Sequence, residues 1–166
     1  MINFAVDIEG LEQWQRAVLS MSEWCQRPMV QPGVFDGLHG AYMDHTEKVW
    51  QTKGGVIGVP WPPLATSTVR QKQRNPRWHG RSILMRSLRL ARSFLSATSR
   101  DHATKKTHQK VEFWTRVPYA KYHQTGTKRM PARPLYLMTE QFGGDYNTVM
   151  RQSLYDFMRT RVNGGI

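Results

Sequence analysis

The chain has 166 residues and a net charge of +12, and this length suits a single domain. Its composition, 39% hydrophobic and 11% aromatic, excludes an intrinsically disordered protein and can supply a buried core. The single cysteine excludes an internal disulfide framework and a cysteine-based zinc site. No run of 18 apolar residues and no signal-peptide pattern occurs, so we expect a cytoplasm-made chain with no membrane partner.

Charge is divided unevenly along the chain. Residues 1–60 hold four basic and seven acidic side chains, a net of −3, whereas residues 61–166 hold twenty basic and five acidic, a net of +15. The basic part could face nucleic acid, where neutralised phosphates release counterions. Alternatively, the acidic part of one copy could meet the basic part of another in head-to-tail contacts that favour a ring. A solvated basic surface without a partner is the third reading.

One strand and two helices are predicted in residues 1–54. Alternating apolar residues predict a half-buried strand over residues 3–8. Spacings of three and four then predict a helix that ends before Pro28 and turns one stripe toward the core: Leu11, Trp14, Val18, Met21 and Cys25. On this stripe, Cys25 is expected to be a buried thiol and no nucleophile. A second stripe predicts a helix over residues 34–51, which a Gly-Gly pair ends.

Proline and basic residues dominate the region that follows. Three prolines in residues 56–64 exclude a helix or a central strand there. Thr66 or Ser67 is expected to cap a short helix that runs toward Lys72. The basic run over residues 70–81 predicts an exposed loop. Beyond it we expect a short helix over residues 83–90 and a strand over residues 90–98. Residues 99–110 are expected to form a polar loop or a hairpin tip.

The last third alternates between regular and irregular structure. We expect a strand, a helical turn and a Gly/Pro loop over residues 110–117, 119–124 and 125–133. An apolar stripe from residue 136 predicts a C-terminal helix, whose regular part is expected to begin after Gly143 and Gly144. The order predicts an α+β fold: a small antiparallel sheet flanked by two N-terminal helices and a C-terminal helix, with long loops. The expected single domain, 1–166, has three parts: 1–54, 55–135 and 136–166.

Sequence motifs for catalysis are missing. The six histidines form no HExxH pattern, and His102 and His108 beside Asp101 are a weak signal for a metal or for acid–base chemistry. GxSxG, GxGxxG and GxxxxGK[ST] do not occur, and no carboxylate pair suits a nuclease metal. We therefore expect no enzyme, no cofactor and no metal site.

Three loop segments carry more information. Each joins rigid proline or glycine to large side chains: residues 61–72 (WPPLATSTVRQK), 83–93 (ILMRSLRLARS) and 117–135 (VPYAKYHQTGTKRMPARPL). The Tyr-x-x-Tyr-His turn offers aromatic faces and polar tips on one side of a helical turn. Pro131 and Pro134 stiffen the chain around Arg133, whose guanidinium is expected to fork onto a carboxylate or a run of carbonyls. A purely core role for Trp61 and the two tyrosines is the alternative.

These segments, in this order and spacing, resemble the virion-morphogenesis or tail-completion family of tailed bacteriophages. The family pattern runs roughly W-x-P-L-x-x-S-T…K, I-L-x-x-[ST]-G-x-L-x-x-S and Y-A-x-x-H-Q-x-G…P-A-R-P-[FL], and it covers about residues 55–140. One departure is Leu88, which stands where the pattern has glycine, so a continuous helix is expected there. Residue 135 is Leu where Phe is common.

The resemblance implies a structural protein of the phage neck, made in the host cytoplasm and located in the virion. It implies a homo-oligomeric ring, of six copies first and twelve second, that completes the tail and joins it to the filled head. The implied partners are tail tube or terminator and head connector proteins, with non-specific contact to passing genomic DNA. A basic DNA-binding protein that acts outside the virion is the alternative.

The candidate residues fall into two groups. Interface or structural motif residues are Trp61, Pro63, Leu64, Ser67, Thr68, Tyr119, Tyr122, His123, Gln124, Gly126, Pro131, Arg133 and Pro134. Basic residues that could face DNA in a ring lumen are Arg70, Lys72, Arg74, Arg77, Arg81, Lys105 and Lys106.

Overall fold

The computed structural model describes residues 11–75, 78 and 82–163. The predicted strand over residues 3–8 and two of the basic candidates, Arg77 and Arg81, lie outside the described residues. Within them the fold is mostly helical α+β, with six α-helices and one antiparallel hairpin packed against helices, as predicted. The helices are α1 (Leu11–Gln26), α2 (Val34–Gln51), α3 (Thr66–Arg74), α4 (Arg89–Leu95), α5 (Ala120–Thr125) and α6 (Glu140–Asn163). Two 3-10 turns, Pro28–Val30 and Gly55–Ile57, join them.

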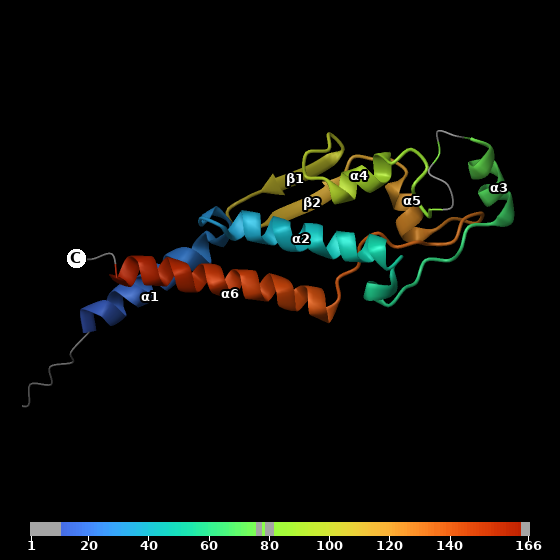
Figure 1. Cartoon of the computed structure of the whole chain (residues 1–166). Coiled ribbons are helices and arrows are strands. Elements are labelled where there is room, and N and C mark those ends of the chain that lie inside the picture. The colour runs from blue at the N-terminus through green and yellow to red at the C-terminus, as the bar shows by residue number, and fades with distance from the viewer. Residues whose placement is uncertain (1–10, 76–77, 79–81, 164–166) are drawn as a thin grey trace, which may run out of the picture.

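The elements are arranged along the length of α2 (Figure 1). α6 runs beside α2, and the hairpin and α4 lie on the other side of α2. α1 crosses α6 at one end of the molecule, whereas α3, α5 and the long loops gather at the opposite end. The hairpin pairs β1 (His102–Lys106) with β2 (Val111–Thr115), in a register that sets His102 opposite Thr115 and Lys106 opposite Val111.

The core lies on both faces of α2. Tyr42 stacks on Phe113 of β2 with ring centroids 4.8 Å apart, and His45 stacks on Phe142 of α6 at 3.8 Å. α6 approaches closely because α2 has a glycine at residue 37: a Cβ there would lie 2.7 Å from the Val149 side chain. α2 therefore packs between α6 on one side and α4 and the hairpin on the other.

The predicted core stripe of α1 is wrong. The helix forms as predicted, but it buries Ser20 and Trp24 while Val18, Met21 and Cys25 of the stripe are exposed. The side chains of the other two stripe residues, Leu11 and Trp14, lie outside those that the structure describes. α1 has one principal neighbour among the helices, α6, so only one narrow face is covered. Apolar residues lie on more than one side of this helix, and periodicity could not tell which side the fold covers.

The segment from residue 83 to residue 98 also differs from its prediction. Residues 83–88 form turns instead of a helix, because Leu84 and Leu88 adopt left-handed backbone angles, φ +61° and φ +60°. The predicted strand over residues 90–98 is the helix α4, which begins after Leu88. Leu88 thus interrupts the helix that was expected to be continuous here, and it adopts the backbone conformation that glycine favours.

Smaller corrections concern element ends. α3 forms, but Ala65 occupies its N-cap position and neither Thr66 nor Ser67 caps it. α6 begins at Glu140 and contains the glycine pair that was expected to precede it. β1 occupies part of the predicted polar loop, and residues 107–110 form the hairpin tip. The predicted 34–51 helix, β2 and the turn at α5 are confirmed. Among the described residues, none of the helices is long and apolar enough to cross a bilayer.

Leu88 gives the first testable prediction. We expect Leu88→Gly to be more stable than Leu88→Ala by about 1 kcal/mol, because glycine carries no penalty at φ +60° and is the better N-cap. The measurement is urea unfolding of both variants. Arg92, exposed inside α4, is the matched control: there the order should reverse, with glycine about 1 kcal/mol less stable than alanine. A less stable glycine variant at residue 88 would contradict the strain argument.

Candidate functional site

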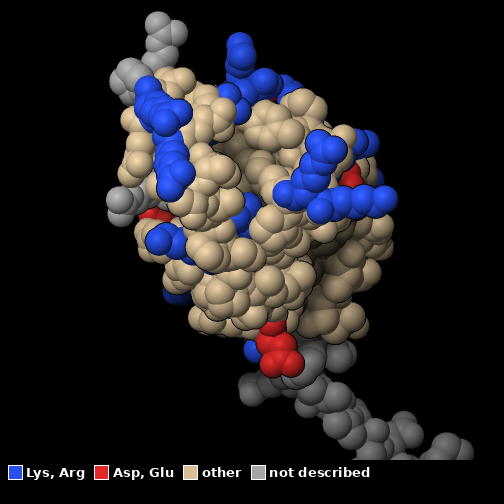
Figure 2. All heavy atoms as spheres, turned by 90° about the vertical axis from the view of Figure 1, so that its right-hand side faces the viewer, with Lys and Arg blue, Asp and Glu red and all other residues tan. Residues whose placement is uncertain are grey.

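The three loop segments converge at one end of the molecule. Together with α3 and α5 they enclose a cavity of about 1010 Å³, which we call the end pocket. Figure 2 looks onto this end and shows a hollow among the side chains. Eight of the motif residues line the end pocket: Pro63, Leu64, Thr68, Tyr119, Tyr122, His123, Pro131 and Arg133. The segments are thus close in space although about 70 residues of sequence separate their outer members.

Arg133 ties the first segment to the third. Its Nε donates to the carbonyl of Pro62 and its Nη2 to the carbonyl of Pro63, both at 3.1 Å, and the residue is only 5% exposed. This is the predicted fork onto a run of carbonyls, made inside one subunit. Burial lowers the pKa of Arg133, but a guanidinium stays charged at any ordinary pH. Arg133 therefore acts as an internal strut, although it lines the end pocket.

Trp61 makes the reciprocal tie. Its indole Nε1 donates to the carbonyl of Pro134 at 2.8 Å, and its ring meets Trp50 edge-on with centroids 5.3 Å apart. The Trp61 side chain is buried, which matches the alternative reading of a core residue under the loops. Each of the two loops therefore donates hydrogen bonds to carbonyls of the other: Trp61 to Pro134, and Arg133 to Pro62 and Pro63.

Gln124 and Gly126 fix the third segment internally. The Gln124 Oε1 accepts from the backbone N–H of Leu135 at 2.9 Å and of Tyr136 at 3.3 Å, and its Nε2 donates to the Tyr136 carbonyl at 2.6 Å. Gly126 has φ +76°, and a Cβ there would lie 2.8 Å from the backbone nitrogen of Ala132. A glycine is required at this position because a side chain would meet backbone and not a movable group.

The predicted position of Lys72 on a DNA-facing surface is wrong. This lysine was expected to face DNA, but it is 5% exposed, and its ammonium donates to the carbonyls of Ser82 and Met85. Burial accordingly lowers the pKa of Lys72. The long stem and terminal donor of lysine reach the turns of residues 82–88, where free carbonyls remain because no helix forms. Lys72 therefore ties the first segment to the second.

The rim of the end pocket is basic. Arg70 and Arg74 are exposed on α3, and Arg86 lies over the Trp78 ring at 3.7 Å. Arg129 lines the pocket, and its described lining contains no Asp or Glu. Figure 2 shows Lys and Arg side chains around the hollow, with few acidic ones among them. An anionic or acidic partner is the complement of such a surface.

Aromatic side chains stand at the same rim. Tyr119 is 36% exposed and Tyr122 is 47% exposed, so neither only plugs the core. His123 meets Tyr119 edge-on with centroids 6.0 Å apart. Burial, and next the nearby charge of Arg133, lower the pKa of His123. Exposed tyrosines beside arginines are side chains that protein interfaces favour.

The remaining candidates are scattered. Ser67 is exposed on α3, and Pro134 is half-buried as the partner of Trp61. Lys105 and Lys106 are exposed on β1, which lies away from α3 (Figure 1), so the two predicted basic loops form no single surface. Lys106 instead places its ammonium 5.3 Å from the centre of the Phe35 ring.

The weak histidine signal resolves into structural contacts. His102 contacts the Ser93 carbonyl through Nδ1 at 3.1 Å and His39 through Nε2 at 3.0 Å. Asp101 accepts two hydrogen bonds of 2.7 Å from Arg89, and these hold the pKa of Asp101 below its ordinary value. Within the described part of the chain, His, Cys, Asp and Glu side chains form no group of three that could hold a metal ion.

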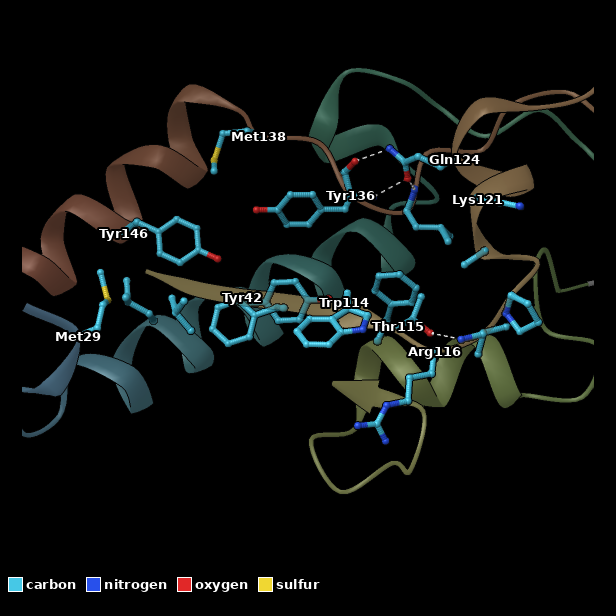
Figure 3. A pocket seen from close by; sticks show the side chains of 18 of the residues that line it. Met29, Tyr42, Trp114, Thr115, Arg116, Lys121, Gln124, Tyr136, Met138 and Tyr146 are labelled. Atoms are coloured by element: carbon cyan, nitrogen blue, oxygen red, sulfur yellow. Dashed lines mark hydrogen bonds between the residues drawn. The ribbon is translucent and has the colours of Figure 1, made fainter. Parts of the chain in front are cut away.

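A second cavity, which we call the β2 groove, was not predicted from the sequence (Figure 3). It holds about 760 Å³ and is lined along β2 and the two residues after it by Val111, Phe113, Trp114, Thr115, Arg116 and Val117. Opposite and beneath the strand it is lined by Met29, Tyr42, Tyr136, Met138, Tyr146 and Met150. These residues come from four separate parts of the chain, so no local pattern could reveal that they meet.

We expect Arg133→Ala to lower the free energy of unfolding by about 3 kcal/mol, because it leaves two carbonyls without their donors and removes a buried stem. Arg133→Lys should recover part of this loss, since an ammonium cannot fork onto both carbonyls. Arg129→Ala, at the exposed rim, is the control and should change stability by less than about 0.5 kcal/mol. Urea unfolding monitored by circular dichroism measures all three; equal effects at residues 133 and 129 would refute the strut.

Stability should also fall in mild acid. Burial lowers the pKa values of His39, His45 and His123 below the ordinary 6.5, so the unfolded chain takes up protons that the folded chain refuses. The stability present above pH 6.5 is then lost as the pH falls toward the folded pKa values. Urea midpoints at pH 7.5, 6.5 and 5.5 measure the loss, and His123→Gln should reduce it. His108→Gln, on the exposed hairpin tip, should not.

The site thus consists of an end pocket with internal ties and a basic, aromatic rim, next to an apolar groove along β2. These contacts come from the chain's own residues. In comparisons with known proteins, no protein-family model, curated protein or solved structure matches the chain.

Proposed function

We propose that this chain is a structural protein of the neck of a tailed bacteriophage, which forms a ring that completes the tail and joins it to the DNA-filled head. The proposal extends the resemblance of the three loop segments to the tail-completion family. One observation carries it: the three segments that make up the pattern enclose one pocket and bond to one another. Residues that share a pattern along the sequence also share a place in the fold.

The pattern's residue types have physical reasons in this structure. The side chains of Trp61, Gln124 and Arg133 hydrogen-bond to backbone groups that would otherwise lose these partners. Gly126 leaves room for the backbone of Ala132, which a Cβ would meet. Leu88 supports the resemblance at its one departure, because it holds the left-handed angle that glycine takes most readily. A pattern of internal struts is what a rigid building block needs.

The surface of the same end supports assembly over catalysis. Its rim offers tyrosines and arginines, and the described lining supplies no carboxylate for acid–base chemistry. The acidic first part of the chain and its basic second part favour contacts between surfaces of opposite charge on neighbouring copies. We propose six copies, with twelve as the second possibility, and tail and connector proteins as neighbours.

The test is assembly of phage particles without this chain. Filled heads and unjoined tails are the expected products, and addition of the purified protein should restore joining. Electron microscopy of complete particles should place the chain between the head and the tail tube. Whole, infectious particles that lack the chain would end the proposal.

Tyr122→Ala is the variant that tests the rim. It should change the free energy of unfolding by less than about 0.5 kcal/mol, since the side chain is 47% exposed, yet it should reduce head–tail joining. Tyr155→Ala, 61% exposed on α6, is the matched control and should join normally. Joined particles counted by electron microscopy give the readout. Equal joining by both variants would remove Tyr122 from the interface.

The basic rim of the end pocket also fits a second function, that of a DNA-binding protein that acts outside the virion. Arg70 and Arg74 are exposed on α3, which lies at this end, and Arg129 is exposed where it lines the end pocket, so phosphates could neutralise all three. Binding to duplex DNA over a salt series separates the two functions. Tight binding with a steep salt slope and no effect on particle assembly favours the DNA-binding protein; weak binding favours the neck protein.

A further inference from the structure

We propose that the β2 groove binds residues 3–8 of a second copy of this chain, which add a third strand to the free edge of β2. The inference rests on the groove and on the N-terminal sequence, and it stands independently of the proposed function. It names one occupant for an apolar cavity that opens beside an unpaired strand edge.

Among the described residues, the edge of β2 that faces away from β1 has no strand partner. The Arg116 N–H donates to the Asp101 carbonyl, and the Thr107 N–H donates to the Lys110 carbonyl. Because antiparallel pairing alternates, the N–H and C=O groups of Val111, Phe113 and Thr115 point away from β1. The same three residues, Val111, Phe113 and Thr115, line the groove. An added strand would give them partners, as in strand addition to other sheet edges.

The walls of the groove suit alternating side chains. Figure 3 shows Tyr146 and Met138 on one side of the groove, with Trp114 of β2 opposite them. Aromatic rings and methionines accept apolar side chains of varied shape. Residues 3–8 read Asn-Phe-Ala-Val-Asp-Ile, so Phe4, Val6 and Ile8 would all point to one face of a strand. That face supplies three apolar anchors for the apolar walls.

Charge complements this pairing. The groove is lined by two cationic side chains, Arg116 and Lys121, and its described lining contains no acidic one. Residues 1–10 carry Asp7 and Glu9 and no Lys or Arg. Their negative charge is complementary to the two cations at the groove.

Reach favours a second copy over the chain's own segment. Met29 lines the groove, and α1 leads away from that point over 16 residues, which is roughly 24 Å. Figure 1 shows the beginning of α1 at the far end from β2. The eight residues 3–10 span at most about 27 Å when fully extended. Residue 3 would therefore return only as far as Met29, and residues 3–8 could not lie along β2.

The exposed side of α1 fits the same contact. Val18, Leu19 and Met21 are 59%, 70% and 43% exposed, although each is apolar. A segment that enters a neighbouring subunit brings its own α1 against that neighbour and can cover this side. The groove and the N-terminal segment are different surfaces, so each copy gives one and receives one, and such a contact repeats into a ring or a chain.

Disulfide trapping tests the proposal on the full-length protein. Cys25→Ser removes the exposed native thiol. Two single-cysteine variants in that background, Val6→Cys and Met138→Cys, are mixed and oxidised, so only an intermolecular bond can join them. We expect a covalent heterodimer, and a synthetic peptide of residues 2–9 should suppress its formation. The control replaces Met138→Cys by Thr98→Cys, which is exposed on the turn after α4 and outside the groove.

In the trapping experiments, three results would overturn the proposal. The first is a yield no higher than that of the Thr98→Cys control, and the second is a yield that the peptide does not reduce. The third is an intramolecular disulfide as the main product when one chain carries both Val6→Cys and Met138→Cys. In the chain without these cysteines, Val6→Asp should raise the dissociation constant for self-association about tenfold or more, without changing the thermal midpoint. An unchanged constant in sedimentation experiments would also count against the groove.

Discussion

The fork of Arg133 onto the carbonyls of Pro62 and Pro63 is the contact on which the loop end of this protein depends. Proline has no N–H, so a proline-rich loop presents carbonyls without the means to pair them with one another. Arginine offers several donors in a fixed fork and no acceptor, which is the chemistry such a loop needs. Trp61 returns the tie to Pro134. With these bonds in place, loops that lack regular structure hold one shape.

This tie divides the motif residues by role. Trp61, Gln124 and Arg133 bond to backbone groups of their own chain, whereas Tyr119 and Tyr122 leave much of their surface exposed. A sequence pattern cannot separate residues that bond to the backbone from exposed residues, because the two kinds lie one or two positions apart on the same short helix and loop. Exposure in the folded chain is what separates them.

The sequence predicts the elements of this fold better than their surroundings. The helix over residues 34–51 and the β2 strand follow from periodicity, because each packs against several neighbours that enforce it. The α1 stripe fails because a helix with one main neighbour covers only one of its apolar sides. The predictions for Lys72 and Leu88 fail for another reason. The Lys72 ammonium is buried, and Leu88 adopts a left-handed backbone angle, because of turns in residues 82–88 that the local spacing of residues does not encode. Eight of the motif residues line one pocket, but local spacing could not predict which partner each of them contacts.

The end pocket and the β2 groove share a wall. In α5, Tyr122 and His123 line the pocket, whereas Lys121 and Gln124 line the groove. Gln124 also holds the backbone of Leu135 and Tyr136, which line the groove two and three residues after Arg133 of the pocket. A strand in the groove would therefore rest on the same helix and loop that shape the basic rim. Closely packed interiors transmit displacement instead of absorbing it, so the proposed contact between copies and the proposed contact with a further partner would meet on one six-residue helix.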